Sequence, residues 1–164
     1  MKAKYKILSI LPALCIMVSI FFFSSQTAGE SSGLSGGITK NFLEGIINIS
    51  NIKLSVSERL EWYNQMETII RKSAHMMEYA ILGIAIAFPV HVYGRRRGRL
   101  ILWSEAICVL YAATDEFHQL YVAGRSGQVS DVIIDGSGAL IGCLIFLFIS
   151  RSIAKRHNQL TIID

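Results

Sequence analysis

Four long apolar segments, separated by polar residues, dominate the chain. They cover approximately residues 6–23, 73–93, 100–118 and 131–150. A helix needs about 20 mostly apolar residues to cross a bilayer, because each residue advances it by about 1.5 Å. The first and last segments meet this requirement alone, and the middle two meet it once a polar flank is included. The pattern predicts an all-α integral membrane protein with a four-helix transmembrane bundle.

The first apolar segment follows three lysines, so it also has the layout of a signal peptide, which would be removed from the mature chain. It is longer than the usual apolar core of such a leader. The candidate cleavage site after Gly29 is also poor, because Thr27 occupies the third position before the cut. We therefore expect this segment to stay in the protein as a membrane anchor.

Residues 24–72, between the first two apolar segments, mix polar and apolar stretches. Residues 24–37 are rich in Ser and Gly, which predicts irregular structure. From Ile38 onward apolar residues recur at roughly helical spacing, and Ser55-Val56-Ser57-Glu58 has the form of a capping box at a helix start. We expect residues 38–72 to form an extracytoplasmic amphipathic helical segment that lies on the bilayer between the first and second spans.

The composition agrees with a membrane protein. Of the 164 residues (18.2 kDa), 52% are apolar and 17% are charged, and the mean hydropathy is +0.44. Soluble domains average about 25% charged residues, and these values also exclude a disordered chain, a collagen and a coiled coil. The 3 cysteines lack the spacing of a disulfide framework or a zinc finger. The length suits a single domain over residues 1–164.

Basic residues gather in three short flanks of the apolar segments. They are Lys2, Lys4 and Lys6, then Arg95, Arg96, Arg97 and Arg99, and finally Arg151, Lys155 and Arg156. By the positive-inside rule these flanks face the cytoplasm, which an even number of spans allows. We therefore predict a multi-pass protein with both termini cytoplasmic. The net charge of +4 then reflects topology and contact with anionic lipid, and we expect no nucleic-acid partner.

Ionisable residues at the outer ends of three predicted spans form the candidate site. Such residues are costly at membrane depth unless paired, so they are often functional. Helical spacing places some of them on one face of each span, and the topology brings the three faces to one depth near the outer interface. The candidate ligand-binding residues are Arg71, Lys72, His75, Glu78, Asp115, Glu116, His118, Gln119, Arg125, Asp131 and Asp135.

Two glycines extend the aspartate stripe of the fourth span. Gly138 and Gly142 lie on the same helical face as Asp131 and Asp135. Small residues four positions apart let a neighbouring helix approach closely. We expect such a helix to bring its polar face against the two aspartates.

The two aspartates need partners, because the fourth span has no basic residue near its outer end. An unpaired buried carboxylate is costly or becomes protonated. We predict that Arg125 folds back from the short outer loop to neutralise Asp131 or Asp135. We further predict that His75 or Arg71 of the second span approaches the other aspartate.

Several motifs, taken in order, resemble those of the VanZ-like family of small bacterial membrane proteins. They are Phe-Phe-Phe-Ser-Ser-Gln at residues 21–26, Arg-Lys-Ser-Ala-His at 71–75, Glu-Tyr-Ala-Ile-Leu-Gly at 78–83, Asp-Glu-Phe-His-Gln at 115–119, Gly-Arg-Ser-Gly at 124–127, and the stretch from Asp131 to Gly138. The resemblance covers roughly residues 7–149, and its specificity lies in the whole set. Asp135 departs from the Asn expected in many relatives, so no fixed role of a carboxylate there is implied.

The resemblance implies a location in the bacterial cell membrane and a phenotype. The founding member of the family is associated with low-level resistance to teicoplanin, a lipid-anchored glycopeptide antibiotic. The family has no established biochemical activity, so the resemblance implies a class of protein and no mechanism.

Three functions are open for the polar cluster. In the first, it binds an envelope ligand (a lipid headgroup, a cell-wall precursor or a lipoglycopeptide), whose phosphate or carboxylate is held by Arg71, Lys72 and Arg125. In the second, it is an intramembrane acid/base or metal-dependent enzyme acting on a lipid-linked substrate. The candidate catalytic residues are His75, Glu78, Asp115 and His118. In the third, the charges only pair with one another and hold the helices in register.

Ligand binding is the function that we favour. Covalent catalysis has little support, because no Ser or Cys has an obvious base at the outer interface. Metal binding has little support either, because the His residues lie on different helices instead of one turn apart. We expect no cofactor and no bound metal, and we expect the lipid bilayer as a partner under every hypothesis.

Overall fold

The computed structural model describes residues 3–160, and within this range the chain is helical and contains no strand. The fold class predicted from the sequence is thus confirmed as all-α. The helices are α1 (Ala3–Leu8), α2 (Leu11–Ser24), α3 (Ala28–Ser50), α4 (Val56–Val92), α5 (Arg97–Gln119) and α6 (Val129–Leu160).

Three stretches of helix in the described part of the chain are long and apolar enough to cross a membrane. They are Lys4–Ser24, Val56–Val92 and Val129–Arg156. α5 has 23 residues but does not meet the same criterion, because charged residues lie near both of its ends and Glu105 lies in its middle. The chain therefore has three clear candidate spans, in an arrangement where α4, α5 and α6 pack against one another and α2 packs on α4.

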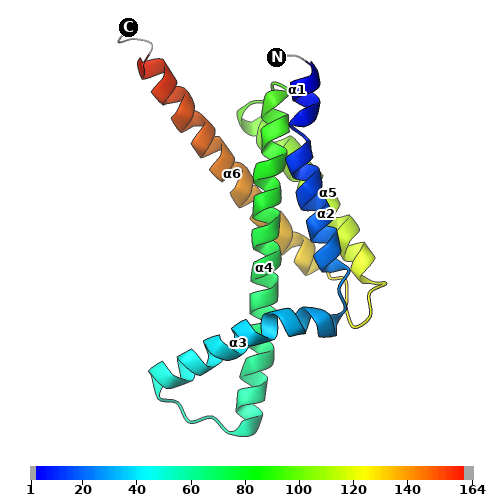
Figure 1. Cartoon of the computed structure of the whole chain (residues 1–164), viewed down its shortest axis with the longest axis vertical. Coiled ribbons are helices and arrows are strands. Elements are labelled where there is room, and N and C mark those ends of the chain that lie inside the picture. Colours follow the sequence, from blue (N-terminus) through cyan, green and yellow to red (C-terminus); the bar gives the residue numbers. More distant parts are fainter. Residues whose placement is uncertain (1–2, 161–164) are drawn as a thin grey trace.

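The elements lie so that the two ends of the described chain are on the same side of the molecule (Figure 1). α1 and the end of α6 lie at the upper end of the view, together with the connection between α4 and α5. The loop between α5 and α6 lies at the other end, beside the junction of α2 and α3, where Ala28 N donates to Ala123 O at 3.3 Å. α3 runs crosswise at that same end, and the first turns of α4 project beyond the bundle.

The crossing of α4 and α6 depends on glycines, as the spacing of Gly138 and Gly142 predicts. A Cβ atom at Gly138 would collide with the carbonyl oxygen of Met76, and one at Gly142 with that of Ala80. Both obstacles are backbone atoms of α4, which no side-chain rotation can move. The absence of side chains at these two positions therefore allows the two helices to touch along their backbones.

The prediction that residues 24–37 are irregular is wrong, because α3 begins at Ala28 and includes the Ser- and Gly-rich stretch. Thr27 and Glu30 form a capping box: Glu30 N donates to Thr27 Oγ1 at 3.3 Å, and Thr27 N donates to Glu30 Oε2 at 2.9 Å. The hydrogen bonds that Thr27 N and Thr27 Oγ1 donate to the Glu30 carboxylate hold the pKa of Glu30 below its ordinary value. The Thr-x-x-Glu pattern was visible in the sequence, and it outweighs the Ser/Gly composition that favoured a loop.

The second capping box was predicted correctly. Ser55 caps α4, accepting a hydrogen bond from Glu58 N at 3.4 Å, while Ser55 N donates to Glu58 Oε2 at 2.8 Å. α4 then continues through the whole second apolar segment without a break. The polar side chains between positions 68 and 78 therefore belong to one continuous helix, which reaches from the projecting turns into the bundle.

Candidate functional site

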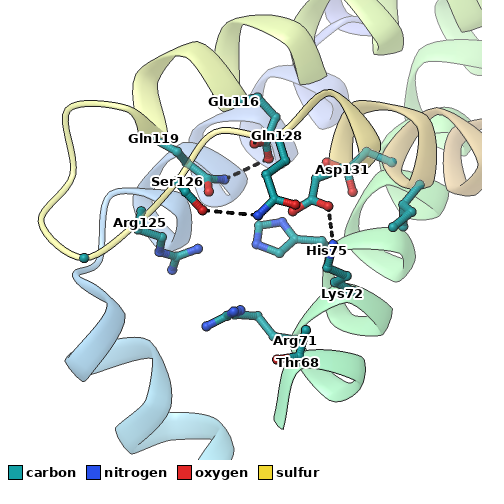
Figure 2. A pocket seen from close by; sticks show the side chains of 13 residues that line it. Thr68, Arg71, Lys72, His75, Glu116, Gln119, Arg125, Ser126, Gln128 and Asp131 are labelled. Carbon is teal, nitrogen blue, oxygen red and sulfur yellow. Dashed lines mark hydrogen bonds and ion pairs between the residues drawn. The ribbon is translucent and has the colours of Figure 1, made fainter. Parts of the chain in front are cut away.

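A cavity of about 250 Å³ lies where the loop between α5 and α6 faces α4 (Figure 2). Its lining includes eight of the residues predicted to bind a ligand. They are Arg71, Lys72, His75, Glu116, Gln119, Arg125, Asp131 and Asp135. The structure therefore brings together residues from four separate parts of the chain, as the shared depth of the polar faces led us to expect.

Two guanidinium groups point into this cavity, Arg71 from α4 and Arg125 from the loop (Figure 2). Arg125 Nε donates to the backbone carbonyl of Gln26 at 3.1 Å, which ties the loop to the junction of α2 and α3. Burial and the nearby Arg71 lower the pKa of Arg125 from its ordinary value. Within residues 3–160, neither arginine has a carboxylate at ion-pair distance. The cavity thus holds two cationic groups that the described protein leaves uncompensated at close range.

The predicted pairing of Arg125 with Asp131 or Asp135 is wrong. Asp131 instead forms an ion pair with Lys72, whose Nζ lies 2.5 Å from Asp131 Oδ1. Lys72 reaches this position because α4 packs against α6, whereas Arg125 is directed toward Gln26. The prediction failed because it weighed closeness in the sequence above the contact between two helices.

The wall opposite the arginines is acidic. Glu116 accepts a hydrogen bond from Gln128 N at 2.8 Å through Oε2 and one from Gln119 Nε2 at 3.2 Å through Oε1. A Cβ atom at Gly127 would collide with the backbone carbonyl oxygen of Glu116, so a glycine there lets the loop lie against α5. Asp135, one turn deeper in α6 than Asp131, is 1% exposed, and neither of its oxygens has a hydrogen-bond partner.

Three of the predicted residues do not line this cavity. Glu78 lies beside His75, with 3.8 Å between Glu78 Oε2 and His75 Nδ1, and it lines a second cavity of about 220 Å³ along α3. Arg71, His75 and Arg125 line both cavities and so separate them. Asp115 is buried and accepts a hydrogen bond from Gln119 Nε2 at 3.4 Å.

His118 has a different environment from the one predicted. Its Nε2 lies 3.3 Å from Ser25 Oγ, and its ring lies against Phe21 with centroids 4.7 Å apart. The expectation that no serine has a nearby base is therefore wrong. The Ser25 hydroxyl, however, donates to the backbone carbonyl of Phe21 at 2.6 Å. That hydrogen bond uses the only hydroxyl hydrogen of Ser25, so this arrangement does not present Ser25 as a nucleophile activated by His118.

Other cavity residues were not predicted. Thr68 precedes Lys72 by one helical turn, so helical spacing would have identified it. Gln128 and Ser126, which hydrogen-bond to each other at 3.2 Å, lie in the loop, where no periodic signal exists. Gln26 does not line this cavity, but its main-chain carbonyl holds Arg125, a role that its residue type does not reveal.

The arrangement is suited to holding an anion. A guanidinium presents a planar fork of N–H donors that matches two oxygens of a phosphate or carboxylate. Two such groups converge here from different elements, and the His75 ring lies beside them in the view of Figure 2. Lys72 is engaged by Asp131, so Arg71 and Arg125 are the cations available to a ligand.

Comparison with known proteins places the chain in a family. The family model described as VanZ/LLP1 matches residues 9–150, which is most of the chain. No curated protein and no solved structure matches it. The matched region includes every residue of the cavity described above. The chain therefore belongs to the VanZ/LLP1 family.

Proposed function

We propose that the cavity between α4 and the α5–α6 loop binds the anionic group of an envelope ligand. The observation that carries this proposal is the convergence of Arg71 and Arg125 on one cavity without a carboxylate at ion-pair distance in the described chain. Two like charges brought together at a half-buried site repel each other and lose hydration. A bound phosphate or carboxylate would remove both penalties at once.

The purely structural alternative explains a different part of the cluster. Lys72 and Asp131 form the kind of ion pair that holds two helices in register, and α4 and α6 are the helices that they join. The same explanation requires a carboxylate at ion-pair distance from Arg71 and from Arg125, which the described chain does not supply. We therefore assign Lys72 and Asp131 a structural role and keep the two arginines for the ligand.

The enzymatic alternative has less support. Among the described residues, Ser25 has the one hydroxyl that hydrogen-bonds His118, and its hydrogen is donated to the Phe21 carbonyl. Two of the four candidate catalytic residues, Asp115 and His118, line neither cavity, and Glu78 lines only the second one. Within residues 3–160, no contact favours a reaction over binding.

The size of the cavity favours a lipid headgroup as the ligand. Sites for drug-sized molecules range from about 300 to 1,000 Å³, whereas this cavity has about 250 Å³. We expect a phospholipid headgroup to occupy it as a whole. A cell-wall precursor or a lipoglycopeptide would place only one anionic group there. A contribution to teicoplanin resistance is part of this proposal, because occupation of an envelope ligand changes what the antibiotic meets at the cell surface.

We further propose that α5 is a fourth span, in the bacterial cell membrane, with both termini in the cytoplasm. Its 23 residues correspond to about 34 Å at 1.5 Å per residue, enough for a hydrocarbon core of about 30 Å. α5 packs beside α4 and α6, and the basic connection before it lies at the same end as α1. In this orientation the cavity opens near the outer interface, within reach of headgroups, and α3 lies along the outer surface.

The topology makes a prediction that accessibility labelling can check. A cysteine in place of Ser32 should react in intact cells with a membrane-impermeant maleimide, whereas one in place of Asn158 should react only after the cells are opened. The unsubstituted chain, with its cysteines at positions 15, 108 and 143, is the control for background reaction. Labelling of the Asn158 variant from outside would contradict both the orientation and the outer position of the cavity.

The binding proposal predicts loss of affinity when one arginine loses its charge. We expect Arg71→Gln and Arg125→Gln each to weaken binding of phosphatidylglycerol by about 10- to 100-fold, because a hydrogen bond to a charged group contributes about 1.5–3 kcal/mol. The measurement is a titration of the purified protein with this lipid, followed by native mass spectrometry.

Arg59→Gln is the matched control for this titration, since Arg59 is an exposed arginine on the same helix, outside the cavity. Equal affinities for the wild type and both cavity variants would show that the arginines hold no anion. A loss of the same size in the Arg59 variant would assign the effect to general surface charge.

A further inference from the structure

Asp135 is the one carboxylate of the cavity that has no hydrogen bond and no ion pair in the described chain. It is 1% exposed, and both of its oxygens lack a partner, although the residue lines the cavity. Its neighbours on the acidic wall differ, because Asp131 pairs with Lys72 and Glu116 accepts from Gln128 N and Gln119 Nε2. A buried carboxylate in this position needs a proton or a cation.

No cation in the described part of the protein serves this carboxylate. Lys72 is engaged by Asp131, and His75 lies beside Glu78. Arg71 and Arg125 line the same cavity but lie beyond ion-pair distance of Asp135. The cavity thus has two separate charged regions, with unpaired guanidinium groups in one and an unpaired buried carboxylate in the other.

We propose that the cavity takes a zwitterionic headgroup, whose phosphate lies between Arg71 and Arg125 and whose primary ammonium lies against Asp135. This inference rests on the proposed anion site and adds the second half of the ligand. A primary ammonium has three N–H donors, which match the two free oxygens of Asp135 and the acceptor oxygens of the neighbouring wall. The ligand class is a phospholipid that carries a phosphate and a primary amine, such as phosphatidylethanolamine or an aminoacyl-phosphatidylglycerol.

A comparison of lipids on the wild-type protein tests this inference without any substitution. The purified full chain is titrated with phosphatidylethanolamine, lysyl-phosphatidylglycerol, phosphatidylcholine and phosphatidylglycerol, and each complex is counted by native mass spectrometry. We expect phosphatidylethanolamine, lysyl-phosphatidylglycerol or both to bind about ten-fold more tightly than phosphatidylglycerol, whose headgroup has no cationic group. Phosphatidylcholine should lose this advantage, because its methylated nitrogen cannot donate hydrogen bonds. The amine lipid that binds more tightly identifies which of these two lipids is the ligand.

The variant Asp135→Asn then tests the residue. It should reduce the affinity for the preferred amine lipid to the level of phosphatidylglycerol and leave phosphatidylglycerol binding unchanged or stronger. Glu105→Gln is the matched control, because Glu105 also has a buried carboxylate oxygen without a partner but does not line the cavity.

The outcomes separate this inference from the anion site. Equal binding of amine lipids and phosphatidylglycerol by the wild type would overturn the zwitterion inference, even where Asp135→Asn fails to fold. An amine preference that survives in Asp135→Asn would overturn the role of Asp135. Absence of binding by all four lipids would overturn the proposed function itself.

Discussion

Replacing Gly142 with leucine should leave almost no folded protein in the membrane. The first atom of the new side chain would collide with the backbone carbonyl oxygen of Ala80 in α4. An overpacked core costs about 1–3 kcal/mol when side chains can move, and here a backbone must move instead. α4 and α6 would have to separate, and close packing is what holds helices together in a bilayer, where lipid tails are as apolar as leucine.

Gly45→Leu is the control for this experiment. Gly45 lies inside α3, and nothing lies within 4 Å of a Cβ atom built there. Both variants are extracted in mild detergent, and the yield of monodisperse protein and its melting temperature are measured. We expect aggregation or loss of Gly142→Leu and near-normal behaviour of Gly45→Leu. A wild-type melting temperature for Gly142→Leu would contradict the close crossing of α4 and α6, on which the position of Lys72 beside Asp131 depends.

Reversing both charges at the mouth of the cavity should abolish its function in cells. In the double variant Arg71→Glu and Arg125→Glu, two favourable interactions of about 1.5–3 kcal/mol each are removed. Two carboxylates then repel the anion, so we expect the affinity to fall by more than about 100-fold. Where expression of the wild type raises the teicoplanin concentration that a susceptible strain tolerates, the double variant should return it to the level of the empty vector.

Arg59→Glu is the control for the charge reversal, since it makes one such Arg-to-Glu change at an exposed position of α4, the helix that carries Arg71. Membrane levels of all three proteins are compared by immunoblotting. If the double variant is present in the membrane at the wild-type level and still confers full resistance, the resistance does not depend on the cavity. A double variant that does not accumulate would instead support the hypothesis that the charges only stabilise the fold.

Helical periodicity explains why much of the site could be predicted from the sequence. Arg71, His75 and Asp135 are on the expected faces because a long helix fixes the direction of every side chain along it. The close approach at Gly138 and Gly142 follows from the same regularity. Within one helix, the local sequence is enough to predict which side chains share a face.

The failures of prediction concern contacts between elements. The position of Arg125 depends on the packing of the loop against the carbonyl of Gln26, which lies almost a hundred residues away in the chain. Asp115 and Glu116 are neighbours in the sequence, yet only Glu116 lines the cavity, because successive helical residues point about 100° apart and the packing of α5 decides which one faces it. Periodicity reveals a face of a helix, and tertiary packing decides what that face meets.

The central claim is that Arg71 and Arg125 hold the anionic group of a lipid in the cavity, and photocrosslinking in intact membranes tests it most directly. A benzophenone-bearing amino acid replaces Thr68, an exposed residue at the cavity, and in a control chain it replaces Val56, which is 89% exposed on the same helix. After illumination, the mass of the purified protein is measured. We predict an adduct with the mass of a phosphate-bearing lipid at position 68. It should be absent from the Arg71→Glu and Arg125→Glu double variant, and much weaker at position 56. An adduct of equal yield with and without the two arginines would contradict the account.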